Sequence, residues 1–325
     1  MKPQRPYIAL TMGDPAGIGP EVVTKALART DLRERMGLLV IGLEAARPEG
    51  LVDGFPEHPG QAGFVEVAGA KTWEMGKAQE ACGLAALSAL EVGADMAKRG
   101  DVQALVTAPV CKEALHMAGE KVEGQTELLA RWDGTERYEM VAVAGDMRVM
   151  LLTRHMPLRE AIASISTDSI GWHLDLFHET LRSIGIEHPH IAMAGLNPHA
   201  GEGGLFGNEE SRILQPAIEA ARARGQHISG PHSPDMVFLD ASQGKNDGVL
   251  ALYHDQAFIP LKLLSKGRGV TLIAGLSYLR VSPVHGTAFD IAGQGIADET
   301  NLVAALERAA TWVGDQQSAI GDTVT

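Results

Sequence analysis

The chain alternates strand-like and helix-like segments over most of its 325 residues, and this alternation is what most constrains its fold. Apolar, β-rich runs lie at 7–12, 38–43 and 102–109, and a long amphipathic helical pattern covers 76–99. Strands that alternate with helices are typical of βαβ units and a parallel sheet. The sequence therefore predicts an α/β fold.

The central segment 140–153 breaks this alternation. Two apolar runs are separated there by Gly145 and Asp146, which predicts an antiparallel hairpin. A hairpin in the middle of a βαβ pattern indicates that one domain is inserted into another. We therefore expect a first α/β domain and an inserted α/β domain, formed respectively by 1–135 plus 285–325 and by 136–284.

The formal net charge of −13 argues against nucleic acid and anionic membrane surfaces as partners. A small anionic substrate remains possible if cations gather locally. Four cations near the informative loops are candidates, and the alternative for each is a solvated surface charge: Lys112, Lys262, Arg268 and Arg280.

The cysteines and the apolar runs indicate the cellular compartment in which the protein is expected. The two cysteines, Cys82 and Cys111, lie in unrelated contexts and indicate neither a disulfide framework nor a cysteine-based zinc site. No run approaches the about 18 apolar residues that span a bilayer, and the start of the chain does not resemble a signal peptide. We expect a cytoplasmic protein.

Three histidines each stand where an apolar run breaks into a polar loop: His155, His199 and His254. Open α/β sheets place their chemistry at the carboxyl ends of strands. Three neutral imidazoles can hold a divalent metal and leave a position open for a substrate oxygen. Burial of each histidine in the core is the alternative.

A glycine-rich loop follows the first predicted strand and precedes a helix. It contains Gly13, Asp14, Gly17 and Gly19, and then Pro20 at the helix start. Glycines let a ligand approach the backbone, and a helix N-terminus favours an anion. The order of the glycines fits neither a Rossmann fingerprint nor a Walker A loop. A tight strand-to-helix turn without a ligand is the alternative.

A second loop near the end of the chain reads HGTAFDIAGQG and starts at His285. Together with the first loop it resembles the β-decarboxylating dehydrogenases of the isopropylmalate and isocitrate type. This resemblance implies that the cofactor NAD is bound by the two loops, with the adenosine side at His285 and Asp290. The cofactor-binding candidates of the first loop are Gly13, Asp14, Gly17 and Gly19.

The strings GDPAGIGPE, NPHAGEGG, YHDQ, GRGV and HGTA are similar to the 4-hydroxythreonine-4-phosphate dehydrogenase (PdxA) family of vitamin B6 biosynthesis, from about residue 6 to 312. The resemblance implies the isopropylmalate-dehydrogenase-like fold, in which two α/β domains enclose a cleft. It also implies a homodimer whose active site is shared, with contacts in the inserted domain. His155, His199 and His254 would bind the metal, with His254 coming from the neighbouring subunit.

The same resemblance assigns catalytic and substrate-binding roles. Asp235 and Lys262 are the catalytic candidates: Asp235 would relay a proton, or alternatively orient its neighbours, and Lys262, together with Arg280, would also hold the anionic end of the substrate. Two positions depart from the family pattern, because Gln125 replaces a histidine and Thr271 replaces an asparagine. Both positions, like Thr126, line the substrate side in the family. Glutamine cannot carry a charge, so the substrate is the least determined part of the prediction.

We therefore expect metal-dependent oxidation of a secondary alcohol, with decarboxylation, of a phosphorylated 4-hydroxythreonine-type substrate. The cofactors would be NAD or NADP, with the acidic composition slightly favouring NAD, and one divalent ion (Zn, Mg, Co or Mn). Alternative substrates are 4-phospho-D-threonate, 4-phosphoerythronate and a carboxylated cis-dihydrodiol. A metal-dependent hydrolase or lyase without nucleotide, and a non-catalytic metal-binding protein, are the other classes.

Overall fold

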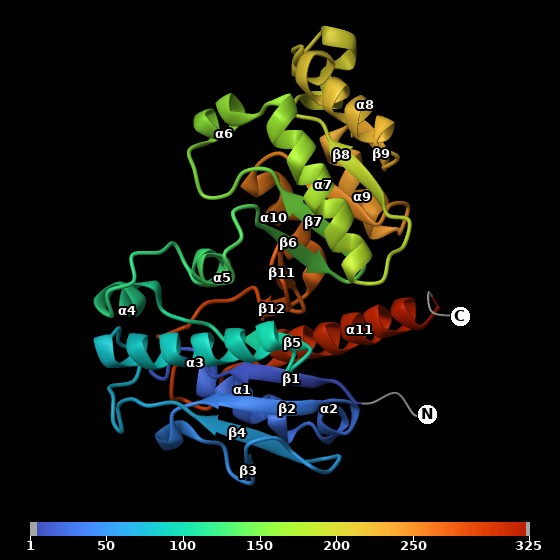
Figure 1. The fold of residues 1–325 in the computed structure, drawn as a ribbon. Coiled ribbons are helices and arrows are strands. Elements are labelled where there is room, and N and C mark those ends of the chain that lie inside the picture. Colours follow the sequence, from blue (N-terminus) through green and yellow to red (C-terminus); the bar gives the residue numbers. More distant parts are fainter. Residues whose placement is uncertain (1–4, 323–325) are drawn as a thin grey trace. The chain divides into compact units, whose positions relative to one another are not determined.

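The computed structural model describes residues 5–322, and the chain divides into two compact units. Unit 1 combines Met1–Glu136 with Leu276–Thr325, and unit 2 is Arg137–Gly275. Figure 1 shows the two ends of the colour scale, blue and red, together in unit 1. The second boundary lies earlier than the expected 284/285. The reason is that the strand Leu279–Pro283 pairs in parallel with Ala104–Thr107 of unit 1.

Unit 1 is built on parallel strands in the order β3-β4-β2-β1-β5-β12. The strands are β1 Tyr7–Thr11, β2 Gly37–Gly42, β3 Val52–Asp53, β4 Ala62–Glu66, β5 Ala104–Thr107 and β12 Leu279–Pro283. The helices are α1 Gly19–Ala28, α2 Thr30–Arg35, η1 Glu44–Ala46, α3 Glu80–Arg99, α4 Lys112–Met117, α5 Gln125–Asp133 and α11 Thr300–Asp322.

The packing of unit 1 follows from its sequence pattern. Strand β2 is buried along its whole length, as its continuous apolar run requires in a sheet covered on both faces. The long helix α3 packs on β1, β2 and β5, and α11 packs on β12 and β5. Helix α3 ends at Gly100, which adopts the left-handed conformation (φ 78°) after two basic residues.

Unit 2 contains strands in the order β11-β6-β7-β10-β8-β9. They are β6 Glu139–Ala144, β7 Met147–Leu151, β8 His190–Ala194, β9 His227–His232, β10 Gly248–Ala251 and β11 Val270–Ala274. The helices are α6 Leu158–Ser164, α7 Thr167–Ser183, η2 Pro198–Gly204, η3 Glu210–Leu214, α8 Gln215–Ala223, α9 Pro234–Ser242 and α10 His254–Ser265.

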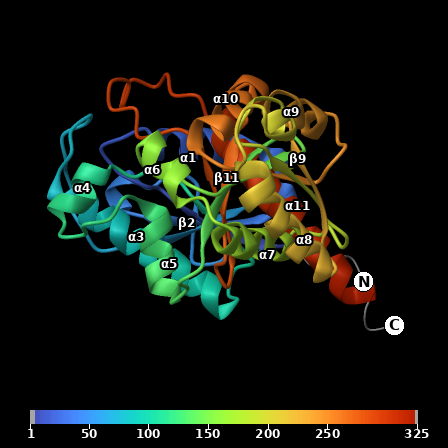
Figure 2. The same cartoon turned by 90° about the horizontal axis from the view of Figure 1, so that it is seen from above.

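The predicted hairpin in the centre of the chain is confirmed. Strands β6 and β7 pair antiparallel, with Val141 opposite Met150, and turn at Gly145 and Asp146. The core of unit 2 joins apolar side chains of these and neighbouring strands to α9 and α10. Helices α9 and α10 contact each other, and Figure 2 shows them side by side.

Among residues 5–322, none of the helices combines the length and the apolar character needed to cross a bilayer.

Candidate active site

Four predicted site residues follow four neighbouring strands of unit 2. Strands β7, β10, β8 and β9 are parallel to one another, so their carboxyl ends lie at the same edge. His155 follows β7, His254 follows β10, His199 follows β8 and Asp235 follows β9. The carboxyl edge of a parallel sheet is where α/β proteins bind ligands. We call this edge, with its three histidines and Asp235, the histidine edge.

Two of the three histidines lie close together in the single chain. The ring centroids of His155 and His254 are 5.5 Å apart. His254 also contacts the Asp255 carboxylate through Nδ1 (2.8 Å) and stacks on Phe258 at 4.6 Å. Within residues 5–322 of one chain, no three His, Cys, Asp or Glu side chains are grouped closely enough to hold a metal ion. The single chain thus brings together one pair of the predicted ligands.

His199 belongs to an unusual left-handed turn. His199, Ala200 and Glu202 have φ values of 53°, 52° and 44°, and the glycines between and after them are also left-handed. Residues with side chains adopt this conformation at a cost of roughly 1 kcal/mol or more each, and such strain is found at functional sites. The turn is held by Glu210, whose buried carboxylate accepts the backbone N–H groups of Leu196 (2.9 Å) and Asn197 (2.7 Å).

Asp235 lies close to His199 and is solvent-exposed. A hydrogen bond from the Ser233 hydroxyl, with a smaller contribution from the charge of His199, lowers the pKa of Asp235. Asp235 is therefore ionised at neutral pH and available as a hydrogen-bond and proton acceptor beside the His199 loop.

The remaining predicted residues of unit 2 are placed differently. Lys262 is exposed on α10, the helix that begins at His254. Thr271 is buried in β11, opposite Ala142 of β6. Arg268 is exposed in the loop before β11. The structure thus puts Lys262 on the same helix as one predicted metal ligand.

In unit 1, Arg280 is a buried cation with neutral hydrogen-bond partners. Its Nη2 donates to the Thr107 hydroxyl (2.7 Å) and to the Gln125 side-chain oxygen (3.0 Å), while Nε finds no partner among the described residues. Burial lowers the pKa of Arg280 to about 10. A buried charge without a counter-charge is costly, so the arrangement is suited to an anionic ligand.

Gln125 and its neighbours begin helix α5. The Gln125 amide donates to the Ala108 carbonyl (3.1 Å), so both ends of its side chain are used, and Thr126 beside it is half-buried. Lys112 is exposed, and its Cε lies near Gly124, 3.7 Å from where a Cβ on that glycine would be. The structure therefore brings two predicted substrate residues, Gln125 and Arg280, into direct contact.

The two motif loops of unit 1 meet. The N–H of Ile18 donates to the Thr287 carbonyl (3.0 Å), and a Cβ added at Gly17 would be 2.9 Å from the Thr287 Cβ. At Gly13, which has φ +70°, a Cβ would collide with the Pro109 carbonyl at 2.2 Å. Close backbone packing thus accounts for both glycines. Their contact with a cofactor stays a prediction.

Three polar groups in these loops are uncommitted or buried. His285 Nδ1 contacts the Gly286 carbonyl (3.0 Å), which leaves Nε2 buried and without a partner among the described residues. Asp14 is fully buried, accepts the Ala16 N–H (2.8 Å), and has its pKa raised by burial. Asp290 is exposed. The free Nε2 of His285 is an acceptor or donor suited to a ligand hydroxyl.

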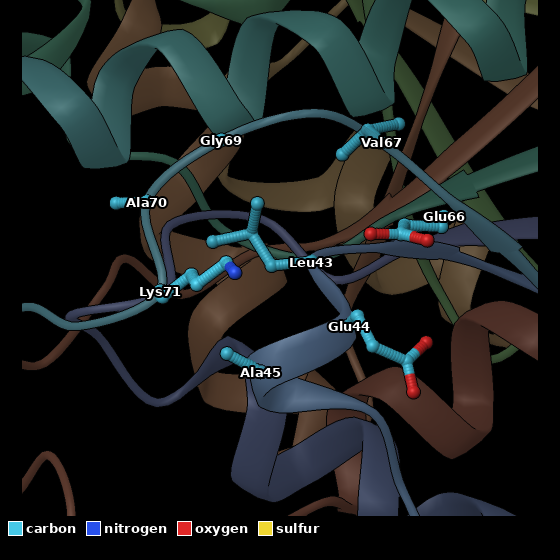
Figure 3. Close-up of a pocket in the computed structure, with 8 residues that line it drawn as sticks. All are labelled: Leu43, Glu44, Ala45, Glu66, Val67, Gly69, Ala70 and Lys71. Carbon is cyan, nitrogen blue, oxygen red and sulfur yellow. The ribbon is translucent and has the colours of Figure 1, made fainter.

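A shallow pocket of unit 1 was not predicted from the sequence. It has a volume of about 350 Å³, and Figure 3 shows its lining at the carboxyl ends of β2 and β4. Glu44 and Glu66 contribute carboxylates and Lys71 an ammonium group. None of the predicted site residues lines this pocket.

Sequence reasoning also missed the buried polar groups that support the histidine edge, chiefly Glu210 and Gln256. Gln256 was visible in the YHDQ string beside His254, whereas Glu210 stands in a polar, helix-starting context that carries no signal of burial.

Comparison with known proteins identifies the class. A family profile described as pyridoxal phosphate biosynthetic protein PdxA matches residues 23–309. The D-threonate 4-phosphate dehydrogenase of Salmonella typhimurium is 42% identical, over 93% of this chain and 97% of that protein. The 4-hydroxythreonine-4-phosphate dehydrogenase of Desulfosudis oleivorans is also 42% identical, over 98% of both chains.

Solved structures agree. The 4-hydroxythreonine-4-phosphate dehydrogenase of Klebsiella pneumoniae superposes with a TM-score of 0.87 at 37% identity, covering 95% of this chain and 99% of that one. The isocitrate dehydrogenase of Methylococcus capsulatus, at 13% identity and a TM-score of 0.52, shares the fold over 97% of this chain and 87% of its own. These likenesses confirm the predicted isopropylmalate-dehydrogenase-like α/β fold, and they define an enzyme of the dehydrogenase class. The chain belongs to the PdxA family.

Proposed function

We propose that this enzyme uses a divalent metal and a nicotinamide dinucleotide to oxidise the secondary hydroxyl of a phosphorylated hydroxy acid, with loss of carbon dioxide. The first candidate substrate is 4-hydroxythreonine 4-phosphate. The observation that carries the proposal is the histidine edge, where three imidazoles and an ionised carboxylate follow neighbouring parallel strands.

The metal ligands would be His155, His199 and His254. Imidazole nitrogens suit Zn²⁺ and Co²⁺ better than Mg²⁺, which prefers oxygen ligands. The strained turn around His199, held by the buried carboxylate of Glu210, supports a role for that imidazole beyond packing. A cation held by these imidazoles would supply Lewis-acid chemistry that favours ionisation of the substrate hydroxyl, and the dinucleotide would supply the hydride acceptor.

The other residues of the chain bind and orient the substrate. Arg280 supplies a charge that its neutral partners leave free for an anionic group, and Lys262 would add a second cation. Gln125, Thr126 and Thr271 would offer hydrogen bonds. Asp235, ionised at neutral pH, would accept the proton that the hydroxyl loses.

The dinucleotide would be held by the two loops of unit 1 that meet at Gly17 and Thr287. The buried, unpartnered Nε2 of His285 fits this role because a ribose hydroxyl can satisfy it, and Asp290 would contact the same part of the cofactor. NAD is the expected partner, because the acidic composition slightly favours the cofactor without the extra phosphate, and NADP is the alternative. The free thiols of Cys82 and Cys111 are in keeping with the reducing cytoplasm.

We infer a homodimer formed through the groove between α9 and α10. The groove has a volume of about 470 Å³ and an apolar lining, and Ile259 and Leu263 are 61% and 75% exposed there. An exposed apolar patch of this kind marks an interface. Since His254 begins the same helix, a second copy seated in the groove would lie next to it. This favours an active site completed by His254 of the other subunit.

A second candidate substrate is D-threonate 4-phosphate, because a relative with that activity in its name is as similar as the hydroxythreonine enzyme. The two compounds share the phosphate, the carboxylate and the oxidisable hydroxyl, and differ in an amine against a hydroxyl. The site features described above concern the phosphate, the carboxylate and the hydroxyl that both compounds share.

The test is a substrate panel with the intact, metal-loaded enzyme. Formation of reduced nicotinamide and release of carbon dioxide are followed with hydroxythreonine phosphate, phosphothreonate, phosphoerythronate and a carboxylated cis-dihydrodiol, each with NAD and NADP. We expect turnover of a phosphorylated acid. His199→Ala should abolish it, whereas the exposed His188→Ala should not. Turnover without any dinucleotide, or full activity of His199→Ala, would contradict the proposal.

A further inference from the structure

A buried amide ties together two of the strand ends of the histidine edge. Gln256, only 7% exposed, lies in the first turn of α10. Its Oε1 accepts the backbone N–H of Leu252 (2.7 Å), and its Nε2 donates to the carbonyl of Gly195 (2.8 Å). Leu252 follows β10 and Gly195 follows β8. One side chain therefore links the ends of two adjacent strands.

A buried hydroxyl adds the third strand end. Thr153, 6% exposed, follows β7, and its hydroxyl donates to the Leu252 carbonyl (2.8 Å). The N–H and the carbonyl of Leu252 are thus both held by buried side chains. We call Thr153 and Gln256, with their shared contact at Leu252, the polar bracket.

The polar bracket joins the segments that carry the predicted metal ligands. Thr153 lies two residues before His155, and Leu252 lies two residues before His254. Gly195 leads into the loop of His199. Buried hydrogen bonds between backbone and side chain leave few alternative positions for the segments, because breaking such a bond leaves a buried polar group without a partner.

We propose that Gln256 is the positioning residue of the metal site and that Thr153 assists it. The inference rests on the proposed function, since it assumes that the three histidines bind a metal. Gln256 itself would not touch the ion. By fixing the β10 end against the β8 end, it holds the segment that leads to His254 and the segment that leads to His199, so that each would present its imidazole to the site it serves in the dimer. Residues in this role typically change metal affinity by roughly 10- to 100-fold when replaced.

The experiment titrates the metal-free, full-length protein with Co²⁺ and records its visible absorption bands, which report the ligand geometry. Gln256→Met keeps the length of the side chain and removes both hydrogen bonds. We expect Co²⁺ affinity to fall by roughly 10- to 100-fold, with altered bands. Thr153→Val, nearly identical in shape, should give a smaller change of the same kind.

The matched control is Gln226→Met. Gln226 also donates a hydrogen bond from its amide, to Asp175 (2.6 Å), but it precedes β9 and so lies at the opposite edge of the parallel strands. Its replacement should leave Co²⁺ binding unchanged. This arm separates loss of a hydrogen-bonded glutamine amide in general from loss of the polar bracket.

Each outcome is decisive. Wild-type Co²⁺ affinity and bands in Gln256→Met would overturn the proposal, as would a loss of thermal stability alone. If Gln256→Met does not fold, Thr153→Val decides by the same criteria. If the wild-type protein binds no Co²⁺ and His199→Ala changes nothing, the proposed metal site itself is wrong, and the inference fails with it.

Discussion

Replacing Arg280 by methionine should stabilise the protein while it weakens anion binding. Arg280 is the buried cation whose partners, Thr107 and Gln125, are both uncharged. Methionine fills similar space without a charge. Opposite effects on stability and binding are the mark of a residue kept for function at the expense of the fold.

The effect on stability follows from the pKa. Burial lowers the pKa of Arg280 to about 10, and a change of this size corresponds to roughly 3 kcal/mol that disfavours the charged form in the folded protein. Both the folded and the unfolded pKa lie well above 7, so the cost is constant across neutral pH. The variant removes a hydrogen-bond donor from the buried Thr107 hydroxyl and from the half-buried Gln125 side-chain oxygen, at about 1–2 kcal/mol together. A net stabilisation of roughly 1–2 kcal/mol remains.

The effect on binding has the opposite sign. Truncation of one partner of a desolvated charge pair costs about 2–5 kcal/mol. Affinity for a phosphorylated substrate should therefore fall by roughly 30-fold or more. The anion would also have to give up its hydration without a compensating charge.

The assay is thermal unfolding of both proteins with and without inorganic phosphate, together with calorimetric titration of the phosphorylated substrate. The expected pattern is a higher midpoint for Arg280→Met without phosphate and a smaller rise on adding it. Arg99→Met, which removes an exposed arginine paired with Asp101, is the control and should change neither quantity much. A less stable Arg280→Met, or one that binds phosphate as the wild type does, would refute the reasoning.

Two further predictions concern unit 2. Subunits carrying His199→Ala and His254→Ala, dissociated and mixed, should regain about one quarter of wild-type activity, because half of the dimers are mixed and each has one intact site. No recovery would show that each chain supplies all its own ligands. Removing the Ser233 hydroxyl with Ser233→Ala should raise the pKa of Asp235 toward its ordinary value, since that hydrogen bond is the main cause of the lowered pKa. The acid limb of kcat/KM against pH should then move to higher pH; an unmoved limb would exclude Asp235 as the proton acceptor.

Local patterns predicted much of the fold. The hairpin of β6 and β7 was recognisable from two apolar runs around Gly145 and Asp146, and the buried strand β2 from its unbroken apolar run. The second unit boundary was misplaced because β12 joins unit 1 through pairing with β5, far away in the sequence. Pairing between distant strands leaves no mark in a local pattern.

The candidate site also has a part that local sequence patterns predict and a part that they do not. A histidine directly after an apolar run predicts a strand-end position, and His155, His199 and His254 all stand at such positions. The left-handed turn at His199 and the neutral partners of Arg280 could not be predicted, because both depend on tertiary contacts. A charged residue inside an apolar run indicates that its side chain is buried, but not which groups its side chain contacts.

Unit 2 leaves and rejoins the rest of the chain through two antiparallel neighbours. Glu139 at the start of β6 faces Ala274 at the end of β11, and a Cβ on Gly275 would be 2.1 Å from the Arg137 carbonyl. The chain therefore enters and leaves the inserted unit 2 at two points that lie close together. If unit 2 were excised, a short turn could connect the two ends left in unit 1. Unit 2, which carries the histidine edge, could then be produced, transplanted or redesigned without disturbing the register of the surrounding strands.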